Sequence, residues 1–137
     1  MVSEALSPKF RRIVPVDATF EKAATGFIFI EGPVWNHRDN YLVWVDIIGD
    51  TIWKWVPGQG KSIVMSPSAH ANGTTFDSQG RLVVAGWSNR NVWRLELDGS
   101  VTTLASHYQG EKINTPNDIV VKSDGNIYFT DPSNGMH

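Results

Sequence analysis

Short runs of β-branched and aromatic residues recur along the chain, and each follows a cluster of turn residues. The runs at residues 41–45, 81–85 and 126–130 come after HRDN, DSQG and KSDG, respectively. Between them, residues 51–56 and 91–97 alternate with the period of two that is typical of β-strands. No stretch of about 11 or more residues has a helical pattern of apolar positions. The pattern therefore predicts an all-β fold.

The predicted strands repeat along the chain. Three segments align: GPVWNHRDNYLVWVD from residue 32, GTTFDSQGRLVVAG from residue 73 and DIVVKSDGNIYFTD from residue 118. Two sets of apolar positions correspond in this alignment: Trp35, Phe76 and Val121, and Leu42, Leu82 and Ile127. The copies begin 41 residues (73 − 32) and 45 residues (118 − 73) apart. Repeats of about 40 to 50 residues, each with about four short strands, indicate a β-propeller.

One oxygen-bearing residue precedes the start of each aligned copy, namely Glu31, Asn72 and Asn117. The innermost strands of propeller blades line a central channel, so equivalent positions in successive blades converge around its axis. A carboxylate with two amides is a set of hard oxygen donors that suits Ca²⁺ or a similar divalent cation. A bound cation would also compensate the charge of Glu31, which lies between two apolar stretches.

Simpler explanations exist for the same three residues. Asn and Gly before a strand are ordinary turn residues, so Asn72 and Asn117 could serve only to form turns. Glu31 could cap a strand at the rim, in solvent. The shared register across three copies favours a site for Glu31 and Asn117, and leaves the role of Asn72 open between a turn and a site.

Composition excludes several functional classes. Hydrophobic residues make up 41% of the 137-residue chain, so it can form a core. The net charge of −2, without a basic run, argues against nucleic acid and membrane surfaces as partners. Cys is absent, which excludes disulfides and thiolate ligands. The first residues lack the apolar region of a secretory signal, so we expect a cytoplasmic protein, although export stays open.

The stretches EGPVW, ANGTTFDSQGRLVVAG and NRNVWRLELDGSVTTLASHYQGEKINTPNDIVVKSDGNIYFTDP resemble the gluconolactonase and senescence-marker-protein (regucalcin) family. The resemblance covers about residues 26 to 135. It implies a six-bladed propeller with one divalent metal ion at the top of the channel, most often Ca²⁺ but also Zn²⁺, Mg²⁺ or Mn²⁺. It also implies hydrolysis of the lactones of sugar acids, with a small-molecule lactone as the partner.

The resemblance assigns roles to individual residues. Glu31 of the EGP motif and Asn117 of the ND motif would be at the metal. Four residues would line the substrate pocket: His70, Asn72, Asn114 and Thr115. Some family members have a substrate-binding Arg at the position of Thr115, which puts sugar recognition at that position in doubt. Asp46 and Asp131, at the ends of strands, are expected to make turn hydrogen bonds. Trp87 breaks the repeat and could edge the pocket, although a structural role is favoured.

Family members are about twice as long as this chain. We therefore expect residues 26–137 to form about the first three blades of the propeller, with repeats that begin near residues 31, 72 and 117. Residues 1–25 would form an N-terminal segment whose strand, near residues 10–16, closes the ring. The acid/base Asp would lie beyond His137, so we expect the chain alone to be inactive. Open blade edges would also favour self-association, and two assembled copies are the alternative to a fragment.

A non-catalytic function is the alternative to an enzyme. Propellers often serve as rigid binding platforms, and a fold does not fix a function. In that case Glu31 and Asn117 could hold a structural ion while a partner binds the loops at the top of the blades.

Overall fold

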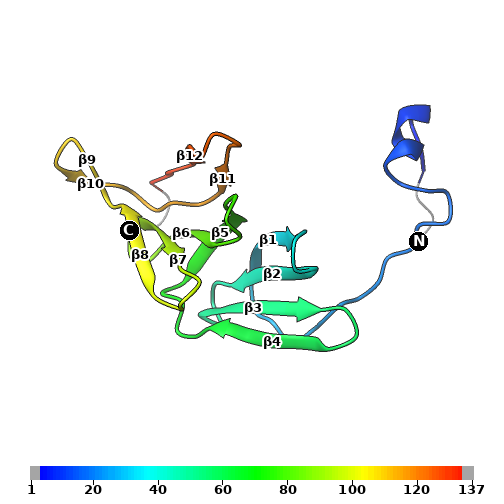
Figure 1. Ribbon diagram of the computed structural model, residues 1–137, viewed down its shortest axis with the longest axis horizontal. Helices are drawn as coiled ribbons and strands as arrows, with labels where there is room; N and C mark the ends of the chain where they lie inside the picture. Colours follow the sequence, from blue (N-terminus) through cyan, green and yellow to red (C-terminus); the bar gives the residue numbers. More distant parts are fainter. Residues whose placement is uncertain (1–3, 134–137) are drawn as a thin grey trace.

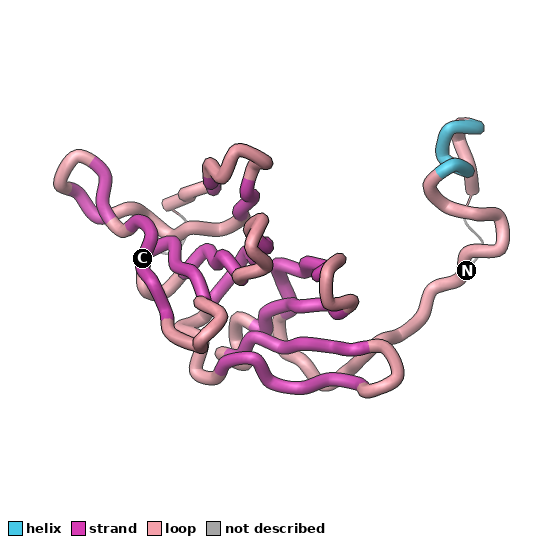
Figure 2. Tube along the Cα trace, viewed as in Figure 1, coloured by secondary structure: helices cyan, strands magenta, loops and turns pink. Residues whose placement is uncertain are grey.

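The computed structural model describes residues 4–133, and almost all of its regular structure is antiparallel β-sheet (Figures 1 and 2). The first sheet contains β1 (Ile30–Asn36), β2 (Tyr41–Asp46), β3 (Thr51–Val56) and β4 (Gly60–Met65), in that spatial order. The second contains β5 (Ala71–Phe76), β6 (Leu82–Gly86), β7 (Asn91–Leu95) and β8 (Val101–Ala105). Two hairpins follow: β9 (His107–Tyr108) with β10 (Glu111–Lys112), and β11 (Ile119–Val121) with β12 (Ile127–Phe129).

The two four-stranded meanders are propeller blades, and the hairpin β11–β12 is the inner part of a third blade. This confirms the prediction of an all-β partial propeller with about three blades. The number of blades in a complete ring stays a prediction. Within residues 4–133, the structure has no helix long and apolar enough to cross a membrane.

Strand pairing confirms the sequence alignment of the three blades. Trp35 pairs with Leu42 in the first blade, Phe76 with Leu82 in the second and Val121 with Ile127 in the third. The innermost strands β1 and β5 also have a register shift at the same point, directly after the aligned residues 31 and 71–72. A bulge of this kind increases the local twist of a strand and changes the direction of its side chains.

The core lies between successive blades. Val43 and Val45 of the first blade share one buried cluster with Leu82 and Val84 of the second. A second cluster joins Val83, Ala85 and Val92 of the second blade to Ile119 of the third. Alternate residues of β6 therefore face opposite neighbours, as the period of two requires. Each fully buried Val or Ile side chain contributes about 1.5–3 kcal/mol to stability.

The innermost strands approach each other closely, because Gly occupies the contact positions. A side chain at Gly32 would collide with the backbone of Asn72 and would lie 2.9 Å from the amide nitrogen of Thr74. A side chain at Gly73 would lie 2.6 Å from the carbonyl oxygen of Asn117. The Gly73 N–H donates to that same carbonyl at 2.7 Å. The positions that follow Glu31, Asn72 and Asn117 thus meet across three blades, as the repeat predicts.

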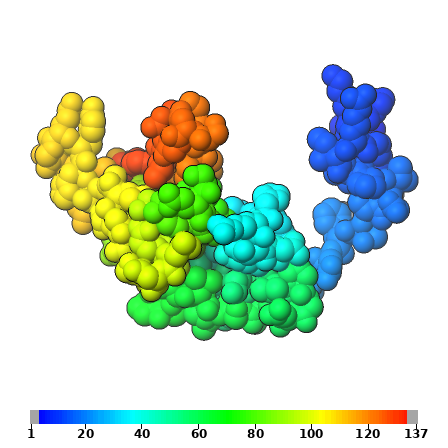
Figure 3. Space-filling view, in the orientation of Figure 1, coloured from blue at the N-terminus to red at the C-terminus, as the bar shows by residue number. Residues whose placement is uncertain are grey.

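The N-terminal segment differs from the expectation. A 3₁₀-helix covers Pro8–Arg12, and no strand is found in the described residues before Ile30. Ser7 caps this helix by accepting a hydrogen bond from the Lys9 N–H, and Pro8 fits its first turn. Residues 10–16 therefore form no strand in the described part of the chain, and their expected pairing with the last blade of a complete ring stays a prediction. A strand needs a neighbour to pair with, and this segment projects away from the blades in the structure (Figures 1 and 3).

Contacts with Lys61 hold the chain between the 3₁₀-helix and β1 against the first blade. The Lys61 ammonium group donates to the carbonyl oxygen of Thr25 at 2.8 Å. It also lies over the rings of Phe27 and Trp53, 4.7 and 5.0 Å from their centroids. The Phe27 ring in turn makes edge contacts with Trp44 and Trp53. These contacts fix the path of the chain into β1.

Candidate functional site

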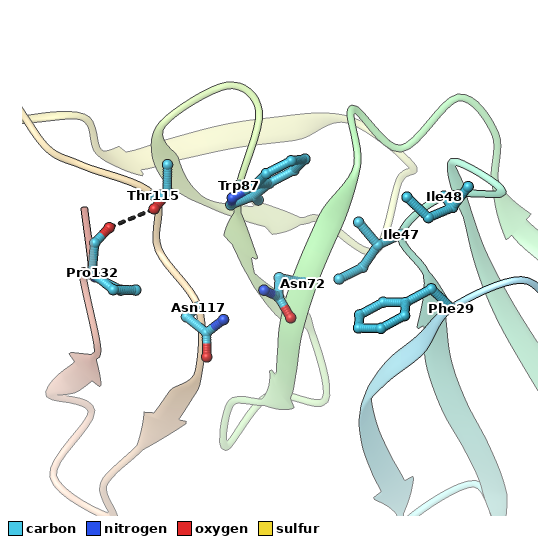
Figure 4. A pocket seen from close by; sticks show the side chains of 8 residues that line it. All are labelled: Phe29, Ile47, Ile48, Asn72, Trp87, Thr115, Asn117 and Pro132. Atoms are coloured by element: carbon cyan, nitrogen blue, oxygen red, sulfur yellow. Dashed lines mark hydrogen bonds between the residues drawn. The ribbon is translucent and has the colours of Figure 1, made fainter. Parts of the chain in front are cut away.

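A hollow of about 290 Å³ lies where the ends of the three blades meet (Figure 4). Its lining combines three polar residues with five apolar ones: Asn72, Thr115 and Asn117, and Phe29, Ile47, Ile48, Trp87 and Pro132. Blade register explains this grouping. Phe29 and Thr115 occupy equivalent positions before the innermost strands, and Ile47, Trp87 and Pro132 occupy equivalent positions after the second strands.

Among the polar residues of the hollow, Asn72 gives the strongest evidence for a ligand-binding site. It is only 6% exposed, yet its side-chain amide makes no hydrogen bond with any described residue. Figure 4 shows the amide between Asn117 on one side and Phe29 on the other. The amide is not among the enclosed polar atoms that lack a partner, so it reaches the surface of the hollow. A polar group that faces a hollow and has no protein partner is placed to bind a ligand.

Asn117 faces the same hollow from the third blade (Figure 4). Its backbone is fixed, because its N–H donates to the Thr130 carbonyl at 3.0 Å and its carbonyl accepts from Gly73. Its exposed side chain makes no hydrogen bond with the described residues. Thr115 is buried, and its hydroxyl group donates to the Pro132 carbonyl. Asn72 and Asn117 therefore have free amide groups, whereas the hydroxyl proton of Thr115 is already used.

Asp46 positions the apolar wall of the hollow. One of its carboxylate oxygens accepts from the backbone N–H groups of Phe29 (2.9 Å) and Gly49 (3.0 Å), and the other accepts from Ile28 (3.0 Å). Burial alone would raise the pKa of Asp46, but these three donors outweigh it and hold the pKa below its usual value. The carboxylate thus fixes both Phe29 and the turn that carries Ile47. The predicted turn role of Asp46 is confirmed.

Asp131 has the equivalent position in the third blade. One of its carboxylate oxygens accepts from the Asn114 N–H at 2.8 Å, as Asp46 accepts from Ile28. The Asn114 side-chain amide donates to the Asp131 carbonyl at 3.2 Å. Asn114 therefore holds the segment before β11 and is not among the residues that line this hollow, and its contact with a substrate stays a prediction.

His70 lies at the rim and does not line the hollow. Its Nδ1 is 2.7 Å from the carbonyl oxygen of Ile47, and its ring makes an edge contact with Trp87 at 6.3 Å between centroids. Its backbone N–H donates to the Asp50 carboxylate at 2.7 Å. Only Nδ1 is used in this contact, so the expected contact of His70 with a substrate, through Nε2, stays a prediction.

Glu31 lies on β1 directly before the close contact at Gly32. It is exposed, and its carboxylate has no partner among residues 4–133. It borders a second hollow, with Phe27, Leu42 and Trp44, on the side of β1 that faces away from the second blade. The structure therefore brings Asn72 and Asn117 into one hollow and places Glu31 at the adjoining strand, outside that lining.

The side-chain oxygen atoms of Glu31 and Asn117 are ligands of the kind that a divalent cation prefers, but these two residues supply only part of a coordination sphere. Glu31 and Asn117 both have free oxygen atoms, and their strands meet through β5. Calcium takes six to eight oxygen ligands. No group of three or more His, Cys, Asp or Glu that could hold a metal ion exists within the described part of the chain. Further ligands would have to come from elsewhere.

The sequence analysis missed most of the apolar wall. Trp87 was expected to be structural; the structure packs it against the core and also places it in the lining. A signal existed, since Ile47 and Trp87 follow equivalent positions at the ends of β2 and β6. Comparing the residue after each second strand, as was done for the residue before each copy, would have found them.

Comparisons with known proteins agree with this geometry. The family model described as the SMP-30/gluconolactonase/LRE-like region matches residues 29–137. A gluconolactonase of Zymomonas mobilis is 30% identical over 144 aligned residues, which cover 95% of this chain and 40% of that protein. Regucalcin of Xenopus laevis is 32% identical over 69% of this chain and 31% of its own length.

Solved structures give the same result. A structure described as a putative gluconolactonase superposes with a TM-score of 0.86 at 32% identity, over 96% of this chain and 46% of that one. A Xanthomonas campestris protein, described as a gluconolactonase important in glucose secondary metabolic pathways, gives 0.76 at 35% identity, over 80% and 37%. Virginiamycin B lyase of Staphylococcus aureus gives 0.61 at 14% identity, over 75% and 34%, a likeness of fold alone. The chain spans about 40% of the length of the gluconolactonase from Zymomonas.

Proposed function

The chain belongs to the SMP-30/gluconolactonase/LRE-like family, and on that premise we propose that it forms one wall of the active site of a metal-dependent lactone hydrolase. The observation that carries the proposal is the side chain of Asn72: the residue is 6% exposed, and its amide faces a hollow shared with Asn117 without a hydrogen-bond partner among the described residues. Lactone hydrolysis develops negative charge on the carbonyl oxygen, and fixed amide donors stabilise such charge.

The role of each side chain follows from the hydrogen-bonding groups that have no partner within the protein. The amide N–H groups of Asn72 can donate to an oxygen atom of the lactone without a conformational change, because the residue is held in β5. Thr115 can still accept a hydrogen bond from a substrate hydroxyl, since its own proton is bound to Pro132. Removing one preorganised donor of this kind typically lowers the rate about 10²–10³-fold.

We propose that Glu31 and Asn117 hold the divalent cation, for which Ca²⁺ is the first candidate; this requires the Glu31 side chain, which borders the other hollow, to turn toward Asn117. When bound, such an ion supplies Lewis-acid polarisation of a carbonyl group. Exposure of the Glu31 carboxylate and the lack of any partner for it support this role, as does the fixed backbone of Asn117.

No residue that lines the hollow is titratable, counting those that the structure describes. Asp46 is committed to three backbone N–H groups, which leaves it unable to take a proton from water. We infer that the general base comes from outside these three blades, and we predict that the 137-residue chain alone does not hydrolyse glucono-δ-lactone. A pH-stat assay would test this, and turnover that is lost on chelation would contradict it.

The same absence of a titratable group favours the alternative, a non-catalytic binding scaffold with a structural ion. Both functions place an ion at Glu31, so a titration with Ca²⁺ tests the metal site that they share. Calorimetric titration of the chain with Ca²⁺ should show one site, and Glu31→Gln should weaken binding at least about tenfold, because the charge of the ligand set determines affinity.

Glu111→Gln is the matched control for this titration, since it removes an exposed carboxylate from β10, outside both hollows. Equal affinities of the two variants would remove Glu31 from the proposed metal site.

A further inference from the structure

We propose that residues 22–27 form a strap over the first blade, and that the ammonium group of Lys61 is the latch that keeps this strap closed. Removing the charge at residue 61 releases the strap while the blades stay folded. The strap borders the hollow on the side of β1 that faces away from the second blade, so the latch is independent of the proposed function.

Three contacts between the strap and the first blade converge on one ammonium group. Lys61 Nζ donates to the carbonyl oxygen of Thr25 at 2.8 Å and lies 4.7 Å from the ring centroid of Phe27. The same nitrogen lies 5.0 Å from the ring centroid of Trp53 in β3, so one charge joins a ring of the strap to a ring of the blade. Each contact depends on the positive charge, because a carbonyl binds a charged donor more strongly than a neutral one and only a cation is attracted in this way to an aromatic face.

The strap packs against Trp44 of β2. Val43 and Val45 belong to the core cluster shared with the second blade, so Trp44 lies on the opposite face of this strand. Trp44 is nevertheless only 6% exposed, and the ring of Phe27 packs edge-on against it with 5.2 Å between centroids. Residues 22–24, Phe27 and Trp44 also line the second hollow, of about 510 Å³. An open strap therefore uncovers an indole ring and the apolar hollow beside it.

The chain on either side of the strap lets it open without the blades. On the N-terminal side, Phe20 is 80% exposed, and this part of the chain projects away from the blades (Figure 3). On the C-terminal side, Asp46 accepts from the backbone N–H groups of Ile28 and Phe29, which fixes the chain from that point on. Gly26 lies between these limits with a φ of +92°, a conformation that Gly adopts readily. A short segment with few buried contacts is of the kind that opens locally.

Chymotrypsin tests the latch, because cleavage after Phe27 requires its ring to leave Lys61 and the Trp rings. When opening and closing are fast, the cleavage rate reports the population of the open form. Lys61→Met keeps an unbranched apolar side chain without the ammonium group. We expect it to raise the initial rate of cleavage after Phe27 at least about tenfold, measured by mass spectrometry of the products. Lys61→Arg, which keeps the charge, should retain most of the protection.

Two controls separate the latch from other effects of the substitution. Lys54→Met removes an ammonium group that lies 5.3 Å from the ring centroid of Tyr41, outside the lining of the second hollow, and should leave cleavage after Phe27 unchanged. In Lys61→Met, cleavage after Phe20 and after Phe76 should also stay unchanged. Phe20 is exposed in any case, whereas Phe76 packs against the core cluster at the end of β5 and becomes accessible when the blade unfolds.

Several outcomes would overturn the latch. Cleavage after Phe27 at the same rate in Lys61→Met and in the parent chain would do so, as would an equal increase in Lys54→Met. An equal increase after Phe27 and after Phe76 would mean that Lys61→Met destabilises the blades as a whole. Parent chain that is cleaved after Phe27 as fast as after Phe20 would show a strap that is already open.

Discussion

Replacing Gly73 with Ala should disrupt the contact between blades on which the site depends. The backbone at Gly73 is not in the left-handed region, so Ala is tolerated locally. Its new methyl group would, however, lie 2.6 Å from the Asn117 carbonyl oxygen and 2.8 Å from the Asp118 Cα, both in the backbone that leads into β11. Real Cβ contacts are longer, so β5 and the third blade would have to move apart.

The magnitude follows from two contributions. Overpacking against a rigid backbone costs about 1–3 kcal/mol. Separation of the strands also weakens the 2.7 Å hydrogen bond from the Gly73 N–H to Asn117, which is worth about 1 kcal/mol. We therefore expect Gly73→Ala to lower the free energy of unfolding by about 3 kcal/mol, a large part of the total of about 5–15 kcal/mol that is usual for a domain.

Urea unfolding followed by tryptophan fluorescence measures this change as a lower midpoint at an unchanged slope. Gly99→Ala is the control, since Gly99 has a φ of +85° but no atom within 4 Å of the added methyl group. Its expected cost is about 1 kcal/mol, from backbone strain alone. The reasoning about close approach at the axis is refuted if Gly73→Ala costs no more than Gly99→Ala.

Two further substitutions test the contacts that support the hollow and the core. Asp46→Ala leaves three part-buried backbone N–H groups without their acceptor and should cost about 3 kcal/mol in urea unfolding. The pKa of Asp46 is lowered in the folded state, so its contribution to the free energy of unfolding is present above about pH 4 and is lost as the pH falls through the folded pKa. The stability of Asp46→Asn should therefore be less sensitive to acid than that of the parent chain. Equal acid sensitivity would argue against this role. Ile52→Ala, at a fully buried position, should cost about 2–5 kcal/mol, while Ile63→Ala on the exposed side of β4 should cost less than about 1 kcal/mol.

Much of the fold could be predicted from the sequence, because the period of two and the turn clusters act locally. The alignment of Trp35 with Phe76 and Val121 holds in the structure, since register is specified strongly where one face of a strand is buried. The expected strand at residues 10–16 stays a prediction, because a strand needs a neighbour for pairing and the described residues do not contain the last blade with which it would pair.

The site could be predicted only in part. Register placed Asn72 and Asn117 in one hollow, but it could not say on which side of β1 the Glu31 side chain would lie, because a bulge follows directly after that residue. Asn114 and His70 have polar side chains that suit a substrate, yet the structure uses them against Asp131 and Ile47. Such competition from nearby backbone groups is not visible in a motif.

The convergence of Asn72 and Asn117 is the central claim, and cross-linking tests it most directly. The chain has no Cys, so two introduced thiols have no competitors. The variant with Asn72→Cys and Asn117→Cys should react rapidly with dibromobimane, a reagent that becomes fluorescent when it bridges two nearby thiols. The variant with Asn72→Cys and Ser123→Cys, in the turn between β11 and β12, should not be bridged. Equal bridging in both variants, or none in the first, would contradict the account.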